Sequence, residues 1–140
     1  MTRSTPCLNQ NNFLLGAFIF EDVGVTAYHG AAPLLNSKVY LSAAAGILAV
    51  EAYHASAIRT LLFQPALFQP VQLISNLRAQ LSGANDDQGI VLNGVANIVP
   101  ADQNAIAFSR TTAQVLNIVY LGGAASNFGF FPNRLNGSIN

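Results

Sequence analysis

Residues 43–62 read AAAGILAVEAYHASAIRTLL, and this stretch decides the fold. It is rich in alanine and leucine, which are among the strongest helix formers. Ser37 can cap the start of a helix, and Pro65 lies beyond its end. The sequence therefore predicts one long helix from residue 38 to about residue 63.

A second helix is predicted just upstream. Asn11 or Asn12 is a suitable N-cap for a helix over residues 13–30, which Pro33 stops. The connection through residues 31–36 is short, so we expect the two helices to be antiparallel neighbours. Both are apolar nearly all the way round, which predicts burial rather than a solvated face.

The remaining residues, 65–140, are predicted to extend the same domain with short helices and an irregular tail. A small repeat, LFQP LFQP over residues 62–70 with one intervening alanine, predicts an extended bend because two prolines lie close together. Helical spacing returns over residues 71–81, and Gly83 is a good residue to end that helix.

The last part of the chain gives weaker signals. Residues 90–99 fit either a short strand or an irregular buried segment. A final short helix is expected over residues 113–121, capped by Thr111 or Thr112. The tail, residues 127–140, has no periodicity, and its Phe128, Phe130 and Phe131 are expected to clamp it onto the helices. With residues 1–12 expected as a disordered arm, the division is 1–12, 13–64 and 65–140.

Composition excludes several classes of protein. Of 140 residues, 51% are hydrophobic and 9% are charged, with six basic and six acidic groups. That length suits one domain, and the low charge is the reverse of the signature of disorder. Six scattered basic residues argue against a nucleic-acid partner. A single cysteine, Cys7, excludes an internal disulfide framework and says nothing about compartment.

Membrane insertion and export are not predicted. The apolar runs over residues 13–20 and 39–50 are shorter than the roughly 20 residues that a bilayer-spanning helix needs. A signal peptide would have to carry Glu21 and Asp22 late in its sequence, which fits poorly. No phosphate-binding loop or nucleophile elbow is present, so no organic cofactor is expected.

The chain contains only two glutamates, and both lie in the predicted helix pair. Glu51 is followed three positions later by His54, which places both side chains on one helical face. Glu21 lies on the preceding helix, at a position that antiparallel pairing can bring to a similar height. One carboxylate and a neighbouring Glu-x-x-His pair form half of the ligand set of a di-iron or di-manganese bundle. The sequence thus predicts Glu21, Glu51 and His54 as metal ligands.

A simpler alternative stays open, because a Glu-x-x-His spacing is common by chance. The pair can also form a hydrogen bond inside a core without any metal. Asp22 points about a quarter-turn from Glu21 and suits a solvent-facing or helix-packing role. Tyr28 and Tyr53 are expected mainly to pack, and His29 lies near a helix end with a surface role.

The segments FEDVGVTAYHGAAPLL (20–35) and AAAGILAVEAYHASAIRTLL (43–62) resemble the ferritin-like desiccation-related proteins of plants, with relatives in bacteria and fungi. The resemblance continues through AFSRTTAQVLNIVY (107–120) and into GFFPNRLNGSI (129–139). It implies a ferritin-like four-helix bundle with a C-terminal extension. It also implies that Glu21 matches the carboxylate of the third bundle helix, and Glu51 with His54 the Glu-x-x-His of the fourth.

The resemblance further implies two more bundle helices upstream, so this chain is expected to be a truncated copy holding half of the bundle. It implies a stress-related protein that binds iron or manganese and whose parent fold performs oxygen or peroxide chemistry. The alternative is a structural stress protein without turnover, or a non-functional copy without the metal site. No compartment is favoured.

A half-bundle of this hydrophobicity is expected to leave an apolar flank uncovered. Either the missing N-terminal half or a second copy would cover it. Two copies related by a two-fold axis would pair their helices into a four-helix bundle, and the same operation would unite two sets of Glu21, Glu51 and His54.

Overall fold

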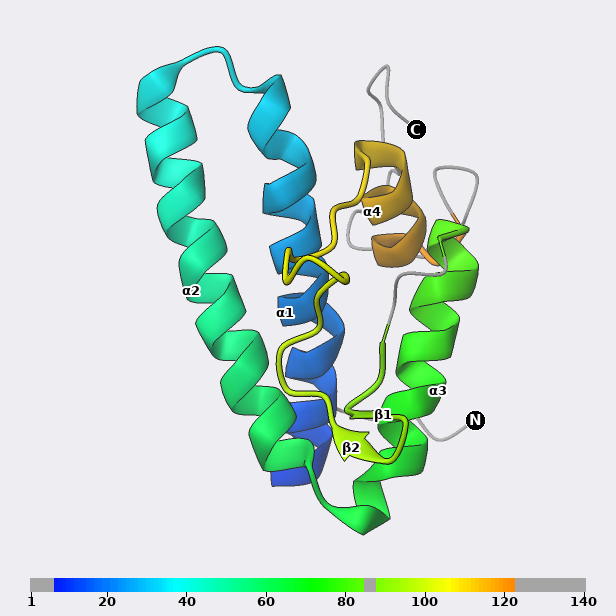
Figure 1. Cartoon of the computed structure of the whole chain (residues 1–140). Helices are drawn as coiled ribbons and strands as arrows, with labels where there is room; N and C mark the ends of the chain where they lie inside the picture. Colours follow the sequence, from blue (N-terminus) through cyan, green and yellow to red (C-terminus); the bar gives the residue numbers. More distant parts are fainter. Residues whose placement is uncertain (1–6, 85–87, 123–140) are drawn as a thin grey trace.

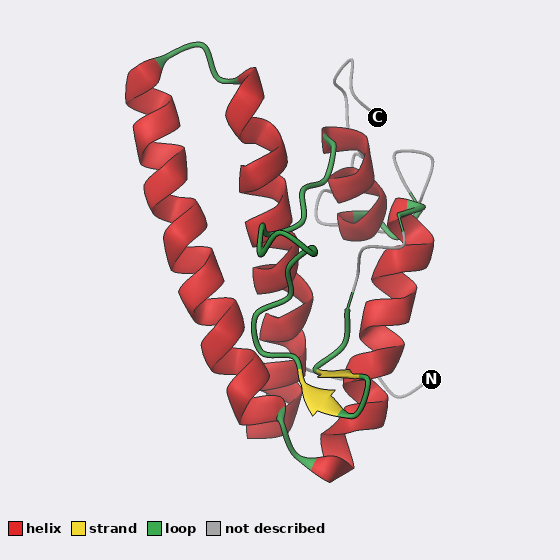
Figure 2. Ribbon diagram, in the orientation of Figure 1, coloured by secondary structure: helices red, strands yellow, loops and turns green. Residues whose placement is uncertain are grey.

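The computed structural model describes residues 7–84 and 88–122, and nearly all regular structure in them is helical (Figure 2). The elements, in chain order, are α1 (Gln10–Ala31), the 3-10 turn η1 (Ala32–Leu34), α2 (Lys38–Leu62), α3 (Pro65–Ser82), β1 (Val91–Leu92), β2 (Val95–Ala96) and α4 (Thr112–Val119). Figure 1 shows α1 between α2 and α3, with the segment that joins β2 to α4 crossing over α1. The all-α class, with two long antiparallel helices, is confirmed.

The α1–α2 hairpin follows local capping chemistry. The Ser37 hydroxyl accepts a hydrogen bond from the Tyr40 N–H at 3.5 Å and begins α2 as predicted. The α1 helix begins at Gln10 instead of residue 13, because Asn9 is the N-cap and its Oδ1 accepts from the Asn12 N–H at 2.9 Å. Residues 10–12, expected in a disordered arm, are therefore helical. Residues 1–6 lie outside the described chain.

The expectation of an extended bend over residues 62–70 was wrong, because α3 begins at Pro65 and runs for 18 residues. Pro65 occupies the first turn, where a backbone N–H has no helical partner in any case. Pro70 lies inside the helix and removes one backbone hydrogen bond near its start. Leu67 and Val71, on either side of Pro70, are buried in the core. Their burial is the tertiary gain that keeps the proline-containing turn helical.

Residues 90–99 were expected to form either a short strand or an irregular buried segment. They contain a small antiparallel hairpin. Val91 pairs with Ala96 and Leu92 with Val95. The turn between them is Asn93-Gly94, with φ of 52° and 77°. Positive φ at both positions is the signature of a type I′ turn, for which Asn-Gly is the preferred pair.

The fourth helix confirms the Thr111 cap. The Thr111 hydroxyl accepts from the Gln114 N–H at 3.3 Å, and the Gln114 side chain accepts from the Thr111 N–H at 2.8 Å, which is a capping box. The helix spans Thr112–Val119, slightly shorter than expected. The tail with its three phenylalanines lies outside the described residues.

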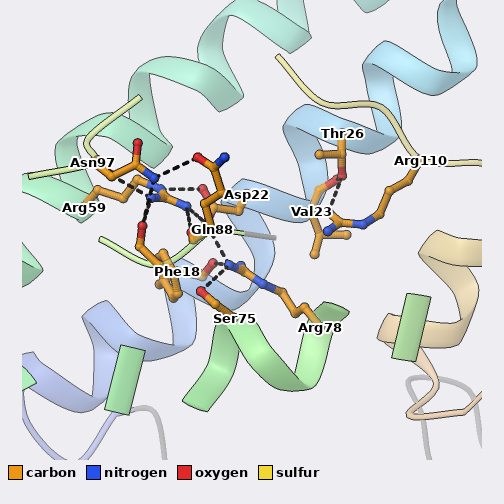
Figure 3. Close-up of polar contacts among 11 residues, drawn as sticks. Phe18, Asp22, Val23, Thr26, Arg59, Ser75, Arg78, Gln88, Asn97 and Arg110 are labelled. Carbon is orange, nitrogen blue, oxygen red and sulfur yellow. Dashed lines mark hydrogen bonds and ion pairs between the residues drawn. The ribbon is translucent and has the colours of Figure 1, made fainter. Parts of the chain in front are cut away.

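One face of α1 carries the polar centre of the molecule (Figure 3). Asp22 is buried and binds two arginines from other helices, Arg59 of α2 and Arg78 of α3. Arg59 donates Nε–H to one carboxylate oxygen at 3.0 Å and Nη2–H to the other at 2.8 Å, and Arg78 donates to the second oxygen at 2.9 Å. One turn earlier, the buried Phe18 ring lies 5.2 Å and 4.4 Å from the two guanidinium carbons. Asp22 thus joins three helices, and of the two roles left open for it, helix packing is the one observed.

Arg59 also fixes the segment after α3. Besides its two bonds to Asp22, its guanidinium donates to the carbonyl oxygens of Gln88, Gly89 and Asn97 at 2.8–3.1 Å. A guanidinium has five N–H donors, so all of them are used. Because every N–H donor of Arg59 is hydrogen-bonded, this charged side chain can be only 1% exposed in a small domain.

A third buried arginine, Arg110, anchors the crossing segment to α1. Its side chain donates to the Thr26 hydroxyl at 2.9 Å, and its backbone N–H donates to the Thr26 carbonyl at 3.0 Å. Gly30 makes this approach possible, because a Cβ there would collide with the Arg110 carbonyl.

The expectation that both long helices are buried nearly all round was wrong. Phe13 and Phe20 of α1 are more than half exposed, and α2 is open to solvent over more of its surface. Only Ala55, Arg59 and Leu62 are buried in it, and Val39, Tyr40 and Tyr53 are more than two-thirds exposed. By length and composition alone α2 is the one described helix that qualifies as a membrane span, with 11% of its apolar window buried. Those two properties are weak grounds for a span, since core helices of soluble proteins share them.

Replacing Asp22 with Asn should destabilise the fold by about 3–5 kcal/mol, because two buried guanidiniums lose their shared anion. Urea unfolding measures the change. Asp102→Asn is the matched control: Asp102 is exposed, and its Oδ1, which accepts from Asn104 and Ile106, is retained. The control should leave the free energy of unfolding nearly unchanged, because the side chain is exposed. Equal effects of the two substitutions would contradict the role given to Asp22.

Candidate functional site

The three residues predicted as ligands lie together on the α1–α2 hairpin. Oε2 of Glu21, on α1, is 3.3 Å from Nδ1 of His54, on α2. The side chain of Glu21 is 24% exposed and that of His54 is 59% exposed. Glu51, one turn before His54, interacts with both of them. The structure therefore brings the three side chains together at the edge of the helix pair, with His54 on the solvent side.

The surroundings of the Glu51 carboxyl, including Glu21, change its pKa. Partial burial, followed by the charge of Glu21 and a hydrogen bond with it, raises the pKa of the Glu51 carboxyl above its ordinary 4.5, and His54 opposes the rise. Oε2 of Glu21 is buried and makes no hydrogen bond among the described residues, although Nδ1 of His54 lies 3.3 Å from it. The two carboxylates of the site therefore carry more negative charge than the neighbouring groups of the protein compensate.

Gly24 gives Glu51 its place against α1. A Cβ at position 24 would overlap Oε2 of Glu51 and come within 2.7 Å of its carboxyl carbon. The missing side chain lets a carboxylate from α2 lie against the α1 backbone, one turn after Glu21. Gly24 is thus a positioning residue that sequence reasoning did not single out.

The donors suit a metal ion in kind, but they are not converged on one point. Two carboxylates and an imidazole are ligands for iron and manganese. Within residues 7–84 and 88–122, no three His, Cys, Asp or Glu side chains are already arranged to hold a metal ion. In the present arrangement Glu21 and His54 face each other directly. Ligation by Glu21, Glu51 and His54 stays a prediction.

The remaining candidates stand apart from this cluster. Nδ1 of His29 lies 3.3 Å from the carbonyl oxygen of Phe108, which ties α1 to the crossing segment. Tyr53 is 74% exposed, Tyr28 is half-buried, and Cys7 is exposed. None of these side chains contributes to the Glu–His cluster.

A cavity of about 70 Å³ lies on the other flank of the hairpin, between α1, α2 and the crossing segment. Its walls are mainly apolar, with Ala52, Ala55 and Phe108 among them, and Asp22 and Arg59 at its polar side. Since every donor of Arg59 is already bonded, this guanidinium is structural rather than a ligand-binding group. The sequence reasoning overlooked the buried arginines. Their signal was a charge within a helical apolar run, the same signal that drew attention to the glutamates.

Gly24→Ala should displace Glu51 from Glu21 and return the pKa of Glu51 toward 4.5, because the flexible carboxylate gives way to the new Cβ. NMR titration of the Glu51 carboxyl measures this change. Gly46→Ala is the matched control, since a Cβ there meets nothing within 4 Å. It should leave the Glu51 titration alone and stabilise α2 by up to about 1 kcal/mol. An unchanged titration in Gly24→Ala would show that Glu51 is held elsewhere.

Glu51→Gln should make the metal-free protein more stable at neutral pH. A carboxyl whose folded pKa is raised contributes its full stability below the unfolded value of 4.5 and loses it as pH rises through the folded pKa. The advantage of the glutamine variant should therefore be absent near pH ~4 and grow to less than about 1 kcal/mol near pH ~7, because the site is partly solvated. Urea unfolding with a chelator present measures it. A constant difference at both pH values would contradict the assignment.

Comparison with known proteins agrees with the fold. A family model for the ferritin-like domain matches residues 2–64. The chain is 33% identical over 130 residues to the desiccation-related protein PCC13-62 of Craterostigma plantagineum, an alignment that covers 79% of this chain and 42% of that protein. It is 27% identical over 148 residues to the ferritin-like catalase Nec2 of Nesocodon mauritianus, covering 91% of this chain and 48% of that protein.

The chain thus spans about half the length of the curated relatives it matches. No solved structure matches it significantly. The long antiparallel helix pair, the family model over that pair and the two relatives together identify the chain as a member of the ferritin-like, desiccation-related family.

Proposed function

We propose that this ferritin-like, stress-related protein binds iron or manganese through Glu21, Glu51 and His54. One observation carries the proposal: Oε2 of Glu21 is buried and makes no hydrogen bond among the described residues, and its surroundings are a second carboxylate and the His54 imidazole, whose Nδ1 lies 3.3 Å away. A buried carboxylate oxygen without a hydrogen bond is costly, and a cation compensates it.

The electrostatics favour a cation over a proton at neutral pH. Burial raises the pKa of Glu51 and the charge of Glu21 adds to the rise, so the two carboxylates gain from a positive charge placed between them. Metal ligands must be deprotonated, so affinity should rise with pH as Glu51 loses its proton. Glu51, beside both other ligands, suits a bridging role, and His54 suits a terminal nitrogen ligand.

The chain's own residues would govern access to such a centre. Glu21 and Glu51 form its inner side against α1, and Gly24 keeps that side open to the Glu51 carboxylate. The exposed imidazole of His54 leaves the outer side accessible to a small solute such as peroxide. A bound iron or manganese ion would supply redox chemistry of the kind that the name of the catalase relative describes for that protein.

A structural role without turnover is the second candidate. The 3.3 Å contact between Glu21 and His54 already joins α1 to α2 without a metal. A stress protein that only maintains its fold during water loss would need nothing more from this pair. Metal content separates the two candidates.

The test is elemental analysis and titration calorimetry on purified protein, with Fe²⁺ and Mn²⁺ as the probes. Wild-type protein should bind metal, and its melting temperature should rise as metal is added. Glu51→Ala and His54→Ala should each weaken binding about tenfold or more, since even groups that only orient a ligand have effects of that size. His29→Ala, at the other histidine, should bind as the wild type does. Equal, near-zero metal in all four proteins would overturn the proposal and favour the structural role.

A further inference from the structure

The cavity between α1, α2 and the crossing segment has a closed end and an open end. Side chains that are almost inaccessible to solvent form the closed end, among them Asp22, Ala55 and Arg59. Val99, which also lines the cavity, is 69% exposed and marks its mouth. A small solute can therefore enter from solvent and lie against the buried polar cluster.

This cavity lies behind the Glu–His cluster and is separate from it. Asp22 and Ala55 line the cavity, whereas their sequence neighbours Glu21 and His54 belong to the cluster on the other side of the same helical turns. The walls of the cavity come from α1, α2 and the segment 88–110, so the chain itself encloses it. A ligand bound there leaves the solvent side of His54 open.

The Asp22 carboxylate has one acceptor position to spare. An ionised carboxylate offers about four such positions. Oδ2 of Asp22 accepts from Arg59 and Arg78, whereas Oδ1 accepts only from Nε of Arg59. Among the described residues nothing donates to the second position of Oδ1. Since Arg59 lines the cavity and Arg78 does not, the oxygen that Arg78 leaves alone is the one on the cavity side.

Gln88 supplies a donor beside this acceptor. Nη2 of Arg59 donates both to Asp22 and to the Gln88 carbonyl oxygen, at 2.8 Å each, which sets the two residues side by side (Figure 3). The side-chain Oε1 of Gln88 accepts from Asn97 at 3.0 Å, and its Nε2 has no acceptor in the described part of the chain. Gln88 lines the cavity as well. A ligand group that both donates and accepts, as a hydroxyl does, suits this pair.

The charges around the cavity favour an uncharged ligand. An ammonium group would lie beside Arg59 and Arg110, while the negative charge of Asp22 is already paired with two guanidiniums. An anion would place its oxygens against the Asp22 carboxylate and would find every N–H of Arg59 already bonded. Either ion would also lose its hydration against walls that are mainly apolar.

The size of the cavity limits the ligand further. A cavity of about 150 Å³ holds benzene, so one of about 70 Å³ encloses roughly three or four non-hydrogen atoms. We propose that the cavity binds a small uncharged alcohol. Its hydroxyl lies between Asp22 and Gln88, and its short carbon chain lies against Ala52, Ala55 and Phe108.

Three probes of one shape test the chemistry of the site: 2-propanol, acetone and acetate, each with four non-hydrogen atoms. Each is titrated into the ¹⁵N-labelled chain with a chelator present, and the amide shifts of Ala55, Gln88 and Phe108 are followed by NMR. The shifts should saturate with 2-propanol. Acetone, which cannot donate to Asp22, should bind about tenfold more weakly or worse, because a hydrogen bond to a charged group is lost. Acetate should give no saturable shifts at these amides.

Cavity-filling variants test the location of the site. Ala55→Leu places three further carbons in the closed end, and Ala107→Leu does so from the crossing segment, so each should abolish the saturable 2-propanol shifts. The second variant carries the test if the first fails to fold. Ala45→Leu is the matched control on an exposed position of α2 outside the cavity, and it should bind 2-propanol as the wild type does.

Equal affinity for 2-propanol and acetone would overturn the proposal, as would tighter binding of acetate, which would assign the cavity to an anion. Shifts that never saturate, or that persist unchanged in the folded cavity-filling variants, would overturn it too. Glu51→Ala and His54→Ala should keep their response to 2-propanol even if they lose metal, so failure of this proposal and failure of the metal site are distinguishable.

Discussion

The fold depends on one carboxylate shared by two guanidiniums. Asp22 sits on the middle of α1 and binds Arg59 from α2 and Arg78 from α3, all of them nearly inaccessible to solvent. An unpaired charge in such a place is strongly unfavourable. Each of these three charged side chains can be buried only because it is paired with an opposite charge. The geometry of the site follows from this cluster, since it sets how α2 lies on α1. Glu21, the preceding residue, then points about 100° away from the cluster and toward His54.

Two adjacent acidic residues on α1 thus have opposite roles. Asp22 is compensated by arginines and organises the interior, whereas the Glu21–Glu51 pair is compensated only in part and remains chemically open. The difference comes from which neighbours each meets across the hairpin. On α2, Arg59 lies eight residues, about two turns, beyond Glu51. The α2 helix therefore places an arginine against Asp22 and a second carboxylate, Glu51, against Glu21.

Local chemistry made the helix pair predictable. Ser37 and Thr111 cap their helices as expected, and the Glu-x-x-His spacing placed Glu51 and His54 on one face. Predictions failed where tertiary contacts overrule local preference. Pro70 is helical because the residues around it are buried, and α2 is exposed because its apolar surface has no described neighbour on the outer side. The roles of Arg59 and Gly24 depend on atoms from distant segments, which no pattern within one helix can indicate.

The separation of these partners along the chain also determines the order of events during synthesis. Arg59 and Arg78 are 37 and 56 residues after their partner Asp22 in the sequence, and Arg110 is 84 residues after its partner Thr26. At roughly 5–20 residues per second, Asp22 has no second guanidinium for about 3–11 s after it is made. The hairpin can therefore form on the ribosome with its closing contacts still missing. During that interval both flanks of α2 are open, and a neighbouring nascent chain can reach them before the fold is closed.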